Sequence, residues 1–103
     1  MGKTARTILV EFKQVQEQIR ALEECASELD QIETQLQNLT AGLRGQWQGE
    51  SADLYYLKCE DLGGKLSRGT KNLRETSDAI KQVAKRYYDA EMKAVELAKQ
   101  RAY

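Results

Sequence analysis

The residues of this chain that could do chemistry are two cysteines, Cys25 and Cys59, and many carboxylates. Histidine, the side chain that most often binds metals and exchanges protons near neutral pH, is absent. Two isolated cysteines cannot complete the four-ligand site of a structural zinc ion. The carboxylates recur at the spacing of a solvated helix face, and not as the close pair that acid/base catalysis needs. We therefore expect no enzyme, no metal site and no cofactor.

Phosphate groups are also poor candidate ligands. The segment Gly63-Gly64-Lys65 lacks the leading glycine and the Ser or Thr after lysine that a phosphate-binding loop requires. Sixteen Lys and Arg residues balance sixteen Asp and Glu residues, so the chain has no basic surplus to offer a nucleic-acid backbone. The sequence thus predicts no nucleic-acid partner.

The amino-terminal run Ile8-Leu9-Val10 is too short for the apolar core of a signal peptide. No stretch approaches the ~20 apolar residues of a membrane span. We expect a chain that is made in the cytoplasm, without a cleaved signal peptide.

Two long segments carry apolar residues at gaps that mostly alternate between four and three, which is typical of amphipathic helices. The pattern predicts one helix over about residues 7–43 and a second over about 51–98. We expect these residues to form the helix seams and the dimer packing: Phe12, Val15, Ile19, Leu22, Leu29, Leu36, Leu62, Leu66, Leu73, Ile80 and Val83.

A glycine-rich corner over residues 44–50 separates the two helices. Gly42 and Gly45 can adopt positive φ and end the first helix, and Ser51 with Asp53 offers capping oxygens and negative charge to the second. A short connection makes the helices antiparallel, so residues 1–103 are predicted to form a single all-α domain, a helix-turn-helix hairpin.

Such a hairpin is thin and leaves apolar side chains uncovered. Five residues off the seams would remain exposed in a lone hairpin: Leu9, Leu54, Tyr56, Leu57 and Val95. We therefore expect two hairpins to pair into a four-helix bundle dimer. Glycines 63, 64 and 69 in the second helix indicate either a locally loose helix or the close approach of a partner helix.

The hairpin also predicts the state of the cysteines. It places Cys25 opposite roughly residue 69, so that Cys25 and Cys59 lie ~15 Å apart along the axis at ~1.5 Å of rise per residue. We expect free thiols, with a bridge between two chains as the alternative.

Two motifs go beyond what helix packing requires. Trp47-Gln48-Gly49 is followed by the small residue Ser51 and the aromatic residue Tyr55. Near the carboxyl end, Tyr87 precedes Glu91 in a Tyr-x-x-x-acid motif. A Trp-x-Gly corner at the midpoint, a late Tyr-x-x-x-Glu and this chain length together resemble the WXG family of small type VII secretion substrates.

The resemblance implies a folded dimer, formed with a second copy or with a sister protein, that a membrane ATPase machine exports from Gram-positive bacteria or mycobacteria. It implies that Tyr87 and Glu91 form a carboxyl-terminal export signal. Trp47 and Gly49 would form the other half of that signal, supplied by the corner of the partner chain. The protein would contact the membrane only through the secretion machine and would end outside the cell or on its surface.

Two other functions stay open. The chain could be a small targeting partner that binds the helical amino-terminal domain of a larger secreted toxin. It could also be a cytosolic coiled-coil adaptor with no link to secretion.

Overall fold

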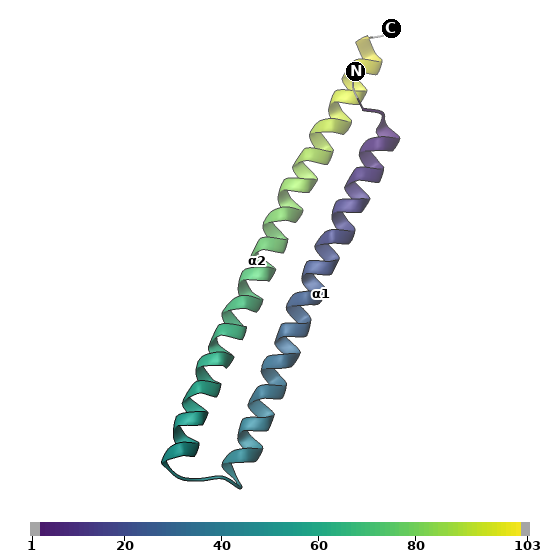
Figure 1. Cartoon of the computed structure of the whole chain (residues 1–103). Coiled ribbons are helices and arrows are strands. Elements are labelled where there is room, and N and C mark those ends of the chain that lie inside the picture. Colours follow the sequence, from purple (N-terminus) through teal and green to yellow (C-terminus); the bar gives the residue numbers. More distant parts are fainter. Residues whose placement is uncertain (1–2, 102–103) are drawn as a thin grey trace. The chain divides into compact units, whose positions relative to one another are not determined.

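The computed structural model describes residues 3–101, which form two α-helices packed as a hairpin (Figure 1). Helix α1 spans Ala5–Arg44 and helix α2 spans Glu50–Arg101. The described residues contain no strand. The all-α hairpin predicted from the apolar pattern is therefore confirmed, and both helices begin and end within three residues of the expected positions.

Helix α1 begins at a side-chain cap that the apolar pattern does not show. Thr4 Oγ1 accepts a hydrogen bond from the backbone N–H of Thr7 at 3.2 Å. The Thr4 carbonyl accepts the first bond of the helix, from the N–H of Ile8 at 3.1 Å. Because one donor that the helix cannot satisfy is paired in this way, the helix starts directly before the apolar run that opens with Ile8.

The corner between the helices is fixed mainly by one glycine. Gly49 has φ of +128°, and it is the one residue with positive φ in the described chain. Its carbonyl accepts the N–H of Asp53 at 2.9 Å and so starts α2, while Glu50 and Asp53 place negative charge in the first turn. A side chain at Gly49 would be strained there, because L-residues rarely adopt this φ.

Two details of the expected corner are wrong. Gly42 lies inside α1, and neither it nor Gly45 has positive φ. Ser51 is the second residue of α2 and not its cap, since the backbone of Gly49 takes that position. The reason is that α1 continues through Gly42 and ends at Arg44. The chain reverses five residues later, at Gly49.

We expect Gly49→Ala to lower the free energy of unfolding by about 1–2 kcal/mol, because alanine must adopt a positive φ. Gly42→Ala is the matched control: its Cβ would meet nothing within 4 Å and its backbone is helical. That change should stabilise the protein by about 0.5–1 kcal/mol. Urea unfolding followed by circular dichroism measures both, and a Gly49→Ala protein as stable as the parent would contradict the corner geometry.

The chain divides into two compact units, each built from parts of both helices. The corner unit comprises Glu23–Arg74 and includes the connection. The terminal unit comprises the described residues up to Leu22 and those from Glu75 onward. Each unit has its own antiparallel pairing of an α1 segment with an α2 segment.

In the corner unit, α2 faces α1 largely through small residues. Its buried side chains are Ala52, Tyr56 and Thr70, and the side chain of Ala26 is buried on α1. The seam residues Leu29, Leu36, Leu66 and Leu73 are half-buried. Ala26, Ala52 and Thr70 are thus the small side chains of this contact, and Tyr56 and the four leucines are its large ones.

In the terminal unit, the best-buried residues are Ile8 and Ile19 on α1 and Ser77 on α2. The Ser77 hydroxyl donates to the Ile19 carbonyl at 3.4 Å, which links the two helices. Phe12 stacks on Tyr88 with ring centres 4.5 Å apart and an angle of 28° between the planes. Together these contacts fix the register of this pairing.

The expectation that Tyr56 would be exposed in a lone hairpin is wrong. Its side chain is only 6% exposed, whereas Tyr55 next to it is 49% exposed. At two places along α2 the residue that contacts α1 comes one position after the expected seam residue. These contact residues are Tyr56 and Thr70. As a result Leu62, Ile80 and Val83 are exposed in the single chain, and so is Val15 on α1.

The glycines of α2 are not required by close approach of α1. A Cβ at Gly63 or Gly69 would meet nothing within 4 Å, and one at Gly64 would meet only the end of the Arg68 side chain. Cys25 is exposed and Cys59 is half-buried, and the two form no bridge with each other. No helix in the described part of the chain is long and apolar enough to cross a membrane.

Candidate functional site

The Trp-x-Gly corner brings together several aromatic rings. The Trp47 ring lies 5.7 Å from the ring of Tyr55 and meets that of Tyr56 edge-on at 6.1 Å. The Tyr56 hydroxyl donates to the Trp47 carbonyl at 2.6 Å. A part-buried hydrogen bond and two ring contacts thus hold the tryptophan at the start of α2, yet its side chain is still 42% exposed.

Arg44, at the end of α1, holds the corner from the other side. Its guanidinium lies 5.0 Å from the centre of the Tyr56 ring and donates to Glu60 Oε1 at 2.7 Å. The arginine therefore connects the end of α1 to the first three turns of α2. These contacts hold the connection and orient Trp47.

The sequence motif included Tyr55 but missed Tyr56 and Arg44. The contacts of both residues can be recognised only once the register of α2 is known. In the sequence, the two adjacent tyrosines fit the aromatic position of the motif equally well. Ser51 of the motif is exposed and has no role in capping.

The late motif lies in the terminal unit, where two adjacent tyrosines differ in environment. Tyr88 packs against Phe12 and is half-buried. Tyr87 is 52% exposed. Since the two side chains point from adjacent positions of one helix, Tyr88 anchors the helix to α1 while Tyr87 remains accessible.

Glu91 follows Tyr87 by one helical turn and is half-buried. It lines a groove of about 680 Å³ whose walls include Arg6 on α1 and Val95 and Lys99 on α2. A second groove, of about 670 Å³, runs past Tyr87 between Ile8, Phe12 and Tyr88. The two residues of the motif thus lie at neighbouring grooves of the same unit.

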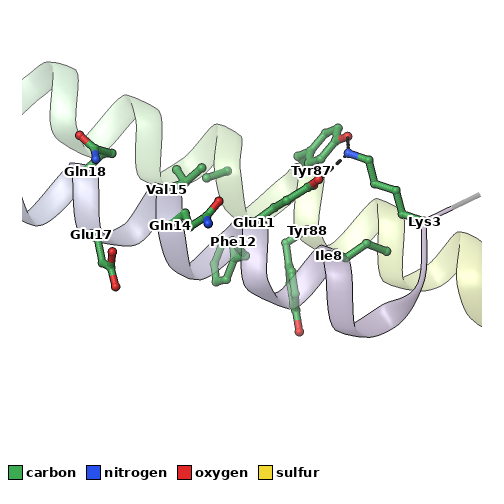
Figure 2. Close-up of a pocket in the computed structure, with 11 residues that line it drawn as sticks. Lys3, Ile8, Glu11, Phe12, Gln14, Val15, Glu17, Gln18, Tyr87 and Tyr88 are labelled. Carbon is green, nitrogen blue, oxygen red and sulfur yellow. Dashed lines mark hydrogen bonds and ion pairs between the residues drawn. The ribbon is translucent and has the colours of Figure 1, made fainter.

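Lys3 joins Tyr87 to α1 (Figure 2). Its ammonium group donates to Glu11 Oε2 at 2.9 Å and to the Tyr87 hydroxyl at 3.1 Å. These two hydrogen bonds, with Glu11 first, raise the pKa of Lys3 well above its usual range, so that the side chain stays positively charged. Sequence reasoning missed Lys3 and Glu11, because nothing in their spacing links them to Tyr87.

The two flanks of the corner unit differ in character. On one flank, ion pairs join the helices: Arg44 to Glu60 at 2.7 Å and Arg74 to Asp30 at 3.7 Å. In the sequence, each of these four residues comes directly after a residue of the repeat that forms the helix contact. In an antiparallel helix pair such positions meet on one side, and the positions that directly precede the contact meet on the other.

The flank opposite these ion pairs is apolar. It carries Ile32 and Leu39 on α1, which precede the half-buried Glu33 and Thr40, and Tyr55 and Leu62 on α2. Leu39 is 67% exposed, more than any other large apolar side chain of the described chain. A row of exposed apolar residues from both helices on one side is typical of a surface that another helix covers.

No group of three or more His, Cys, Asp or Glu side chains between residues 3 and 101 could hold a metal ion. The arrangement of the chain is that of a protein that presents aromatic side chains and apolar helix faces to other proteins.

The chain belongs to the WXG100 family, since the family model described as "Proteins of 100 residues with WXG" matches residues 7–92. This match confirms the resemblance carried by the Trp-x-Gly corner and the late tyrosine motif. The family consists of small helical secreted proteins that are associated with type VII secretion and typically form hairpin dimers with partners; it is not known for enzymatic activity. No curated protein and no solved structure matches the chain.

Proposed function

We propose that this protein is a secreted substrate of a type VII secretion system that is exported as a folded dimer. Tyr87 and Glu91 of one chain form the carboxyl-terminal half of the export signal. Trp47 and Gly49 at the corner of the partner chain form the other half. The secretion ATPase reads both halves, so an unpaired chain is not exported.

The observation that carries the proposal is the exposure of both aromatic residues on firmly held backbone. Trp47 is held by Tyr56 and Tyr87 is flanked by the anchored Tyr88, yet each has about half of its side chain accessible. An aromatic side chain that only filled the core would be buried. Exposed, oriented aromatic rings are the groups that contribute most to recognition by another protein.

The apolar flank of the corner unit supports the dimer. Ile32, Leu39 and Leu62 are each about half or more exposed. A second copy of this chain or a sister protein of the same family would cover them and complete a four-helix bundle. The flank with the Arg44–Glu60 and Arg74–Asp30 ion pairs is already closed by polar groups and is the less suitable side.

The same apolar flank also suits the second candidate function, a targeting partner for a larger secreted toxin. That partner would cover Leu39 and Leu62 with helices of its amino-terminal domain. Gel filtration with light scattering separates the two candidates. A substrate that pairs with itself elutes at twice its chain mass of 11.7 kDa. A toxin-targeting chain by itself elutes at the mass of one chain, and it shifts to the summed mass of the complex when the larger protein is added.

The export signal is tested in the native host. We expect wild-type protein in the culture medium. The folded Tyr87→Ala and Trp47→Ala proteins should be retained in the cell, with export at least about tenfold lower than that of wild type, because a central aromatic contact is lost. Circular dichroism confirms that each variant is folded, and Gln31→Ala, at an exposed polar position outside both motifs, serves as control.

Equal amounts of all these proteins inside the cell, with none in the medium, would contradict export and favour the cytosolic adaptor. Normal export of both aromatic variants would show that the protein is secreted by another signal.

A further inference from the structure

We propose that Lys3 and Glu11 are positioning residues of the export signal: they orient the Tyr87 hydroxyl so that its proton is offered to a hydrogen-bond acceptor on the secretion machine. This inference rests on the proposed role of Tyr87 in export. It adds an amino-terminal part to the carboxyl-terminal half of the signal, Tyr87 and Glu91.

The placement of Lys3 follows from the start of α1. Thr4 caps the helix, so the chain turns out of the helix axis directly before it. Lys3 therefore lies beside the first turns of α1, where its ammonium group contacts Glu11 Oε2 at 2.9 Å. A long side chain held at its end by a carboxylate has fewer rotamers available than a free lysine.

The lysine reaches Tyr87 through the hydroxyl and not through the ring face. Its nitrogen is 3.1 Å from the Tyr87 oxygen but 5.5 Å from the ring centre, which is near the far limit of a cation–ring contact. An ammonium group can only donate. The Tyr87 oxygen is therefore the acceptor, and the hydroxyl proton is left for another partner.

This arrangement decides what the partner must provide. A phenol whose oxygen accepts a bond from a cation is a stronger donor through its own O–H, because hydrogen bonds in a chain polarise one another. The matching group on the secretion machine is an acceptor, a carboxylate or a backbone carbonyl. A cationic partner group is disfavoured, since Lys3 already places a positive charge at this point.

Figure 2 shows that Tyr87 and Tyr88 leave α2 in different directions, and that only Tyr87 meets Lys3. Tyr88 stacks on Phe12, whose ring lies in the same groove. Tyr87 is 52% exposed, so packing restricts its side-chain rotamers less than those of the half-buried Tyr88. The Lys3–Glu11 pair supplies the fixed orientation that packing supplies to Tyr88.

The test combines export with a direct readout of Tyr87. We expect Lys3→Ala and Tyr87→Phe each to lower export about tenfold, the loss expected for one charge-assisted hydrogen bond in recognition. Lys3→Arg should restore export, because a guanidinium can donate to both Glu11 and Tyr87. Lys13→Ala, which removes a positive charge from an exposed position of α1, should be exported like wild type.

The purified dimer, labelled with ¹³C in its tyrosine rings, gives the second readout by nuclear magnetic resonance. The Tyr87 ring signals, identified by their loss in Tyr87→Phe, should shift in Lys3→Ala and stay in place in Lys3→Arg and Lys13→Ala. Unchanged Tyr87 signals in Lys3→Ala would overturn the contact. Wild-type export of Lys3→Ala or Tyr87→Phe would overturn its role in the signal.

The two proposals fail in different ways. If Tyr87→Ala is retained in the cell while Lys3→Ala is exported normally, the export signal stands and the positioning role of Lys3 is wrong. If Tyr87→Ala is itself exported normally, the proposed signal is wrong, and with it the role of Lys3 in export.

Discussion

Replacing Ile19 by aspartate is expected to unfold the protein or to lower its melting temperature by more than ten degrees. Ile19 is 3% exposed on the inner face of α1, and its carbonyl accepts the hydroxyl of Ser77. The substitution removes a buried apolar side chain and puts a charged carboxylate in its place. The combined cost is about 4 kcal/mol or more. That is a large fraction of the ~5–15 kcal/mol by which folded domains are stable.

Thermal unfolding followed by circular dichroism measures this effect. Gln16→Asp is the matched control, since it introduces the same residue into the same helix at an exposed position and should cost less than about 1 kcal/mol. The same change at Leu36 or Leu66, which are half-buried, should have an intermediate effect. If Ile19→Asp and Gln16→Asp melted together, the register of α1 against α2 would be wrong.

Replacing Leu39 by aspartate is expected to leave the hairpin folded and to prevent it from pairing. Leu39 is 67% exposed in the single chain, so its removal costs the isolated hairpin little. In the dimer it would be covered, and an unpaired carboxylate at that contact should weaken association at least ~100-fold. Sedimentation or light scattering measures the change in mass, and circular dichroism confirms that the helices are retained.

Leu54→Asp is the control that makes this experiment decisive. Leu54 is 63% exposed, and it lies two residues from both Ala52 and Tyr56, which are buried. Positions two apart on a helix point in nearly opposite directions, so Leu54 faces away from α1, and it lies about 100° around the helix from Tyr55 of the apolar flank. We expect this variant to pair like the parent. If Leu54→Asp were monomeric and Leu39→Asp dimeric, a partner would cover the other side of α2.

The apolar flank also explains why the expected seams and the observed contacts differ. After Leu29 the apolar pattern of α1 runs through Ile32, Leu36, Leu39 and Leu43, and of these Leu36 is half-buried while Ile32 and Leu39 are exposed. The contact with α2 continues instead through Glu33 and Thr40, which are half-buried. A helix that must contact two neighbours carries two overlapping apolar rows. Hydrophobicity alone cannot tell which row belongs to the chain's own hairpin and which to a partner.

The sequence by itself determined the two helices, the position of the corner and the family. These follow from local rules: the repeat of apolar residues along each helix, glycines that interrupt it, and a Trp-x-Gly motif between the two repeats. The absence of histidine and of a net charge leads to the expectation of no metal site and no nucleic-acid partner.

Only the tertiary structure decided which side chains those helices bury and which they present. In the folded chain the reversal is at Gly49 and not at Gly42 or Gly45. Tyr56 is buried instead of Tyr55, and Lys3 donates a hydrogen bond to Tyr87. Each outcome depends on the rotation and register of one helix against the other. That is set by the summed packing of small residues such as Ala26, Ala52 and Thr70 across the contact, which no local pattern in either helix contains.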